Sequence, residues 1–95
     1  MNIEEVFEKY SDEFLKFDSV KDKLHTRPDM CAFLLLDKLL PGEGRDIICG
    51  AAHDEIFLDA DCDELAKVAT EEGIIALVRC GARLDSSSGG LAMFA

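Results

Sequence analysis

Residues 53–84, HDEIFLDADCDELAKVATEEGIIALVRCGARL, decide the fold because they carry the clearest signals for where elements begin and end. Within this stretch EIFLD, residues 55–59, is short, apolar and β-favouring, which predicts a strand. Asp61 then stands three residues before Glu64, the spacing of a capping box, so that its carboxylate can accept from the free amides of a helix start. The helix that follows is expected to bury Leu65, Val68 and Ala69.

A second helix start is predicted at Thr70, because this hydroxyl cap precedes two glutamates that suit the positive end of a helix dipole. Residues 74–80, IIALVRC, are therefore predicted to be helical despite their β-branched content. Gly81 is well placed to end that helix in a left-handed conformation. The alternative is a strand over residues 74–80, with Gly73 ending the preceding helix. The cap chemistry favours the helix.

Two more helices are predicted upstream. Apolar and aromatic side chains recur at helical spacing over residues 2–16, with charged side chains between them, as in an amphipathic helix. Pro28 suits the first turn of a helix that runs through MCAFLLLDKLL, residues 30–40, and ends at Pro41-Gly42. This helix is apolar on nearly every side, which is typical of a central core helix. Alternatively, its additional apolar face pairs with a second copy of the chain in a homodimer.

Short apolar stretches between turn residues predict strands. Residues 46–52 form one, which turns through residues 53–54 into the EIFLD strand as a hairpin. Residues 82–84 and 91–94 form two more, separated by a polar loop that contains glycine. The predicted fold is an α+β domain, with about four helices packed on a small antiparallel β-sheet.

Length and composition limit the class of protein. Residues 1–95 are enough for a single domain, and 48% hydrophobic content is enough for a core. No run of about 20 apolar residues is present, and the acidic N-terminus is unlike a secretory signal, so we expect a cytoplasmic protein that does not bind membranes. The four cysteines lack C-x-x-C and zinc-site spacing, and are expected to be small buried hydrophobes: Cys31, Cys49, Cys62 and Cys80.

Negative charge is concentrated in one part of the chain. The formal net charge is −10, and residues 54–72 hold eight acids and only Lys67 as a base, which makes them −7. Such a field repels nucleic acid phosphates and attracts basic surfaces, so we expect no direct nucleic acid binding and a basic protein surface as partner. The candidate protein-binding residues, called the acidic ridge, are Asp54, Glu55, Asp59, Asp61, Asp63, Glu64, Glu71 and Glu72. The alternative interpretation is an ordinary solvated face.

The motifs that would indicate metal binding or catalysis are incomplete. Residues 59–63, DADCD, alternate like the start of a calcium loop, but Glu64 and Thr70 stand where that loop requires glycine and glutamate. His53-Asp54 lacks the further ligands of a metal hydrolase. Cys49 is about 13 Å from His53 on an extended strand, too far for a nucleophile–base pair. We therefore predict a non-enzymatic protein without catalytic residues, metal or cofactor.

Arg79 and Arg83 form an alternative, ligand-binding site. Together with the loop of residues 86–90 they could hold a phosphate or carboxylate, which would make the chain a small-ligand (nucleotide or anion) binding protein. The more ordinary expectation is that these arginines pair with local acids, either Asp85 or the Glu71-Glu72 helix start.

Four segments resemble small uncharacterised accessory proteins of tailed phages and prophages. They are HDEIFLD, TEE, RCGARLD and LAMFA, and the resemblance covers residues 29–95. It carries no assigned activity and no functional residue, but it implies an accessory protein that binds host or defence proteins in the host cytosol. The leading hypothesis is therefore a non-enzymatic phage-type accessory protein that binds a basic host or defence protein surface, in its sharpest form as an acidic nucleic-acid mimic and inhibitor. The alternatives are the small-ligand binder and a structural homodimeric phage protein.

Because the calcium-loop pattern is incomplete, neither millimolar calcium nor a chelator should change the thermal unfolding of the protein. Calorimetry with calcium, with EDTA and with magnesium as the control checks this expectation. A calcium-specific stabilisation of more than about 1 kcal/mol would contradict it, because a ligand that binds only the native state stabilises that state by mass action.

Overall fold

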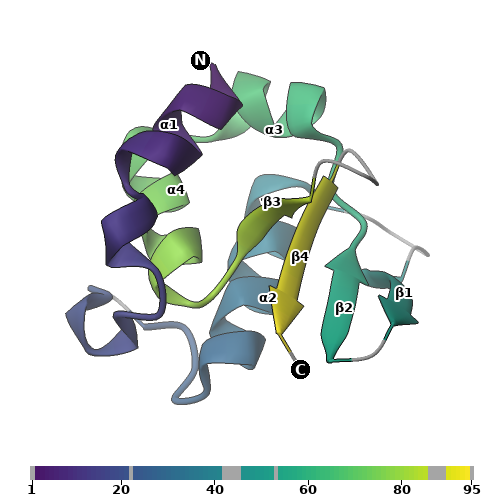
Figure 1. The fold of residues 1–95 in the computed structure, drawn as a ribbon, viewed down its shortest axis with the longest axis horizontal. Coiled ribbons are helices and arrows are strands. Elements are labelled where there is room, and N and C mark those ends of the chain that lie inside the picture. The colour runs from purple at the N-terminus through teal and green to yellow at the C-terminus, as the bar shows by residue number, and fades with distance from the viewer. Residues whose placement is uncertain (1, 22, 42–45, 53, 86–89, 95) are drawn as a thin grey trace.

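The computed structural model of the chain describes residues 2–21, 23–41, 46–52, 54–85 and 90–94. Helices and strands are mixed along these residues, which confirms the α+β class and the small antiparallel sheet (Figure 1). The helices are α1 (Ile3–Lys9), α2 (Pro28–Leu39), α3 (Cys62–Val68) and α4 (Glu71–Arg79). The strands are β1 (Ile48–Ala52), β2 (Glu55–Leu58), β3 (Arg83–Asp85) and β4 (Gly90–Phe94). Two 3-10 turns, η1 (Ser11–Glu13) and η2 (Phe17–Ser19), follow α1.

The strands form one sheet in the order β1-β2-β4-β3, which places the C-terminal strand in the interior of the sheet. Every neighbouring pair is antiparallel, and β1 pairs with β2 as the predicted hairpin requires. A row of cross-strand neighbours on the core face consists of Leu58, Leu91 and Leu84. The corresponding row on the opposite face consists of Phe57, Ala92 and Arg83. Side chains alternate between the faces of a strand, so this register fixes which residues face the helices.

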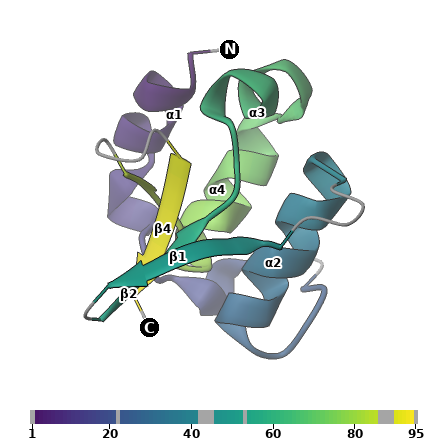
Figure 2. The same ribbon diagram turned by 90° about the vertical axis from the view of Figure 1, so that its right-hand side faces the viewer.

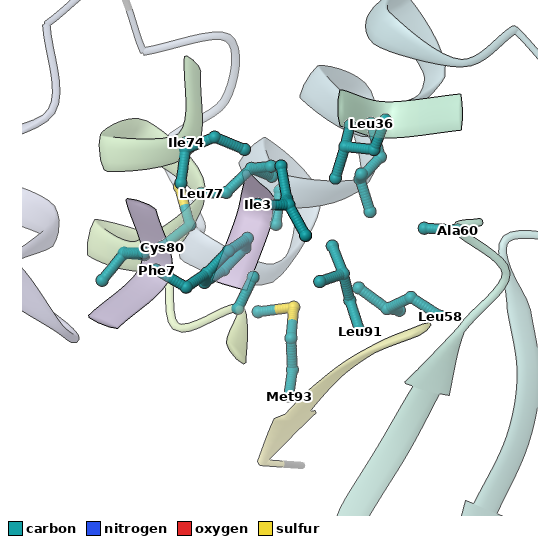
Figure 3. Close-up of a cluster of buried hydrophobic side chains, with 14 of the residues drawn as sticks. Ile3, Phe7, Leu36, Leu58, Ala60, Ile74, Leu77, Cys80, Leu91 and Met93 are labelled. Atoms are coloured by element: carbon teal, nitrogen blue, oxygen red, sulfur yellow. The ribbon is translucent and has the colours of Figure 1, made fainter. Parts of the chain in front are cut away.

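The helices gather on one side of the sheet, and the hairpin of β1 and β2 lies on the side of the molecule away from α1 and α4 (Figures 1 and 2). α4 is central because it packs against both α1 and α2, and α1 also lies beside α3 and β3. The side chains that fill the space between helices and sheet are apolar, and no polar or charged residue is buried among the described residues (Figure 3). Burial of apolar surface is therefore the main source of stability.

The caps of α4 decide between the two predictions for residues 74–80. The Thr70 hydroxyl accepts from the Gly73 amide at 3.1 Å, and the segment is a helix that begins at Glu71. Its end is a Schellman motif, in which the Ala82 amide donates to the Leu77 carbonyl and the Gly81 amide donates to the Val78 carbonyl. Gly81 has a φ of 101°, the left-handed conformation that the sequence predicted for it. The cap at Asp61 is also confirmed, since its carboxylate accepts from the amides of Asp63 and Glu64.

The N-terminal helix is shorter than predicted. α1 ends at Lys9, and the apolar periodicity that continues to residue 16 belongs to η1 and an irregular segment. Leu15 has a φ of 65°, which breaks the helical path, and its amide donates to the Val78 carbonyl at the end of α4. A contact with α4 thus replaces the local helical hydrogen bond. The predicted burial of Val68 is likewise wrong, because this side chain is 49% exposed at the end of α3, whereas Leu65 is fully buried.

α2 begins at Pro28 and ends before Pro41, as the sequence predicts. It buries Cys31, Ala32 and Leu36, while Met30 and Leu34 remain exposed. Among the described helices, none combines the length and the apolar character that crossing a membrane requires.

Substituting Gly81 with alanine should lower the free energy of unfolding by about 2 kcal/mol, since a left-handed conformation strains any residue with a Cβ. The added Cβ would also lie 2.9 Å from Leu15 Cδ2. Gly73→Ala is the matched control, because the Cβ would lie 3.5 Å from the Thr70 hydroxyl, an ordinary contact, inside a helix. It should stabilise the protein by up to about 1 kcal/mol. Urea unfolding of both variants measures the difference, and equal effects would contradict the assigned role of Gly81.

Candidate functional site

The acidic ridge is divided in space between the two ends of β2. Asp54 and Glu55 lie at its start, and Asp59 follows its end, with the remaining acids on α3 and α4. A strand rises about 3.3 Å per residue, so the length of β2 separates the two groups by more than 10 Å. Figure 1 shows α3 at one end of the molecule and the start of β2 at the other. The ridge is therefore not one continuous surface.

Glu55 is neutralised on the face of the sheet opposite the core. Its carboxylate pairs with the Arg83 guanidinium, which also lies over the Phe94 ring at 4.7 Å from the ring centroid. The strand β4 lies between β2 and β3, so this ion pair bridges across it. Arg83 Nε is buried without a hydrogen-bond partner in the part of the chain that the structure describes. The predicted pairing of Arg83 with Asp85 or Glu71-Glu72 is thus replaced by a contact across the sheet.

Most acids of α3 and α4 have a local structural role. Asp61 caps α3, and the Glu64 carboxylate pairs with Lys67 Nζ at 3.1 Å. Glu71 accepts a hydrogen bond from the Tyr10 hydroxyl at 2.9 Å. The four glutamates and aspartates that follow the two caps lie in the first turn of a helix, where the dipole favours negative charge: Asp63, Glu64, Glu71 and Glu72. Helix capping therefore accounts for part of the charge that defines the ridge.

The structure brings an acid from α1 to the start of α3. Burial raises the pKa of the Cys62 thiol, and the carboxylates of Asp61, Asp63 and Glu4 raise it further. The charge of Glu4, which is far from the other two acids in sequence, therefore acts on the same thiol. α1 and α3 lie side by side in both views (Figures 1 and 2). We call Glu4, Asp61 and Asp63 the α1–α3 acidic surface.

Glu4 lies outside the predicted ridge, which covers residues 54–72. The available signal was its position on the polar side of an amphipathic helix at the N-terminus. Amphipathic periodicity does not show which distant element the polar side of this helix lies against. The proximity depends on how α1 packs against α3, which periodicity along one segment does not specify.

A pocket of about 440 Å³ lies beside this surface, between α1 and the edge of the sheet. Its lining is mainly apolar: Phe7, Phe14, Val78, Ala82, Leu84 and Phe94. The polar lining residues are Glu4, Glu8, Ser11 and Arg83. Pockets of 300–1,000 Å³ with apolar walls and a few polar groups are typical binding sites for small ligands or side chains. Glu4 belongs both to the pocket and to the α1–α3 acidic surface, so the two are continuous.

Arg79 is held away from Arg83 by other partners. Its Nε donates to the Glu13 carboxylate at 3.2 Å, and another guanidinium nitrogen donates to the Ser19 carbonyl at 3.1 Å. The hydrogen bond from Arg79 lowers the pKa of the Glu13 carboxyl. The expected partners Asp85 and Glu71-Glu72 are again replaced by a residue distant in sequence. Arg79 and Arg83 therefore have different partners on different elements. Residues 86–89 of the predicted ligand loop lie outside the described residues.

The cysteines differ in environment, which corrects the expectation that all four are buried. Cys31 and Cys80 are buried in the core, Cys62 is half-buried and Cys49 is exposed on the edge strand β1. Burial, together with a hydrogen bond to Cys31, raises the pKa of the Cys80 thiol to about 12. A thiol with such a pKa is a poor nucleophile at neutral pH. His53 lies outside the described residues, so the structure does not test the prediction that it is too far from Cys49 to act as its base.

No group of three or more metal-binding side chains converges among the residues that the structure describes. No protein-family model, curated protein or solved structure matches the chain. The fold and the site therefore define it as a small acidic α+β protein with an apolar pocket next to a carboxylate surface.

The four thiols should alkylate in a fixed order at about pH 8, because the thiolate is the reacting form. Cys49 should react first, Cys62 more slowly, and Cys31 and Cys80 only after unfolding. Iodoacetamide labelling followed by peptide mass spectrometry measures each rate. Replacing Asp63 with asparagine should accelerate the reaction of Cys62, by less than about fivefold, because it removes one repelling charge. Alkylation of Cys80 before Cys49 would contradict the environments described above.

Proposed function

We propose that the protein is a non-enzymatic binding protein that holds a basic protein surface against its α1–α3 acidic surface. The observation that carries this proposal is the packing of α1 against α3, which places the acids at the starts of these two helices, Glu4, Asp61 and Asp63, at one end of the molecule (Figure 1). Two of these acids are explained by the start of α3, but Glu4 comes from another helix. Fixed negative charge on two packed helices needs no reorganisation on binding, which suits recognition of lysine and arginine side chains.

The net charge of −10 supports the same function. A surplus of negative charge accelerates the approach of a basic partner and disfavours nucleic acid, whose phosphates it repels. Attraction between exposed charges is screened by salt, so both the rate and the affinity of such a complex fall as ionic strength rises. Because the ridge residues are divided between the two ends of β2, the proposed contact involves the end of the molecule where α1 and α3 begin.

The narrower form of the proposal concerns the biological role. The resemblance to phage and prophage accessory proteins supports a host or defence protein as the basic partner. If that partner normally holds nucleic acid, the carboxylates would occupy positions used by phosphates, and the protein would act as a nucleic-acid mimic and inhibitor. Competition with nucleic acid for the purified partner distinguishes this form from binding elsewhere on the same partner.

The anion-binding alternative has less support. Arg83 reaches the pocket but is paired with Glu55, and Arg79 is occupied by Glu13. Glu4 and Glu8 also line the pocket, and their negative charge repels a nucleotide or phosphate. An apolar pocket with two glutamates is better suited to a cationic group.

Replacing Asp63, which belongs to the α1–α3 acidic surface, and its neighbour in the first turn of α3, Glu64, with lysine should weaken binding to a partner captured from host lysate, identified and then purified. Both side chains are exposed, so the fold should survive with a lower melting temperature caused by the lost helix-start charges. Asp61 is left intact because losing a cap costs about 1 kcal/mol by itself. Calorimetric titration measures the affinity at 50 mM and 500 mM salt, which changes the Debye length about threefold.

The matched control for this experiment is the double variant Asp12→Lys/Asp37→Lys. It shifts the net charge by the same amount at exposed positions outside the α1–α3 acidic surface. Equal weakening by both double variants would indicate a general charge effect. Unchanged affinity in the Asp63→Lys/Glu64→Lys variant, together with no salt dependence, would contradict the proposal. The surface would then be an ordinary solvated face.

A further inference from the structure

The pocket beside α1 presents the carboxylates of Glu4 and Glu8, and the cationic side chain among its described lining residues, Arg83, is already paired with Glu55. Glu4 and Glu8 are exposed, both line the pocket, and neither has an ion-pair partner among the described residues. They are four residues apart on α1, so their side chains are neighbours on the helix surface. Two like charges at this spacing destabilise a helix rather than support it.

Glu8 is unfavourable for a second reason. It lies in the last turn of α1, where the negative end of the helix dipole disfavours an acid. Glu4 lies in the first turn and has a local structural role there, as the acids of α3 and α4 do. The helix dipole therefore explains Glu4 but not Glu8. The position of Glu8 is explained if a cation from another molecule is bound beside it.

The remainder of the pocket is suited to an apolar group. Phe7 and Val78 contribute from the core, and the Phe14 and Phe94 rings meet edge to face at a centroid distance of 6.4 Å. Phe94 is 57% exposed, so part of its ring is open to a further contact. A volume of about 440 Å³ lies in the range that accommodates a drug-sized ligand and is ample for one aromatic or branched side chain.

A second hollow, of about 590 Å³, lacks this combination of groups. It lies between α2 and the sheet and has apolar walls that include Leu15, Phe33 and Ile48. The charged residues that line it, Arg27 and Asp29, pair with each other at 3.4 Å. Of these two hollows, the pocket beside α1 is the one for which charge complementarity identifies an occupant.

We propose that this pocket binds a segment of a basic protein that places one aromatic or large aliphatic side chain against the Phe14 and Phe94 rings and a neighbouring lysine or arginine beside Glu4 and Glu8. The inference rests on the proposed function and names the anchor of the same partner. An apolar anchor excludes water from its surroundings, which strengthens the adjacent ion pair. The methylene stem of the basic side chain also covers apolar lining while its charged head reaches the carboxylates.

Synthetic peptides provide the test without a known partner. The first probe carries Leu-Phe flanked by lysines, the second replaces Leu-Phe with Ala-Ala, and the third replaces the lysines with glutamates. The first probe should bind at least about tenfold more tightly than either of the others. The second probe lacks the apolar anchor, and the third lacks the basic side chains. Backbone amide shifts of the labelled protein should change at the pocket, including Phe7, Ser11 and Leu84.

Two variants and their controls locate the site. Glu4→Gln/Glu8→Gln should reduce affinity for the first probe at least about fivefold, since two ion pairs are lost. Glu5→Gln/Glu72→Gln removes the same charge from exposed positions outside the pocket and should change affinity less than about twofold. Phe94→Ala should weaken binding, whereas Leu34→Ala, which truncates another exposed apolar side chain, should not.

The outcomes separate this inference from the proposed function. Equal binding of the Leu-Phe and Ala-Ala probes, with amide shifts confined to the start of α3, would overturn the pocket assignment and leave the acidic surface in place. Failure of every lysine-containing probe to bind would overturn both.

Binding of phenethylammonium alone as tightly as the first probe would assign the pocket to a small organic cation. A dimer that Phe94→Ala dissociates would assign it to a second copy of the chain. Either of these last two results would overturn the inference.

Discussion

The left-handed turn at Gly81 is the constraint on which the arrangement of this protein depends. It ends α4 and starts β3, and both of its hydrogen bonds return to the last turn of the helix. A side chain at this position would meet Leu15 on one side and Met93 on the other, so the helix, the sheet and the segment after α1 are in contact here. The same turn brings Ala82 and Leu84 to the pocket wall.

The negative charge of the chain has two physical origins. Capping and helix dipoles account for the acids at the starts of α3 and α4, where negative charge stabilises local structure. Glu8 has no such explanation, because it lies at the wrong end of α1 and one turn from another glutamate. An acid at a helix start stabilises that helix and needs no further explanation. An acid that destabilises its own helix has no such local role, and it is therefore better evidence for a binding partner.

The pocket and the acidic surface are parts of one candidate interface. Glu4 belongs to both, and α1 is the element that connects them. Arg83, which might have offered an anion site, is instead engaged by Glu55 and the Phe94 ring. The candidate interface thus combines carboxylates with an apolar cavity, and this combination is complementary to a basic segment that carries an apolar anchor.

Sequence alone was enough to predict the fold class, the hairpin of β1 and β2, the N-caps of α3 and α4, and the left-handed glycine. The hairpin, the caps and the glycine are predictable because they depend on residues within one or two turns of each other. The sequence did not determine where α1 ends, since the amide of Leu15 bonds to α4 rather than to its own helix. It also misplaced the partners of Arg79 and Arg83, which are Glu13 and Glu55 rather than nearby acids.

The candidate site, in contrast, arises from the packing of elements that are distant in sequence. The pocket joins residues from α1, α4, β3 and β4, and the acidic surface joins α1 to α3. Such groupings depend on how the elements pack, whereas periodicity and capping report only on the chain a few residues away.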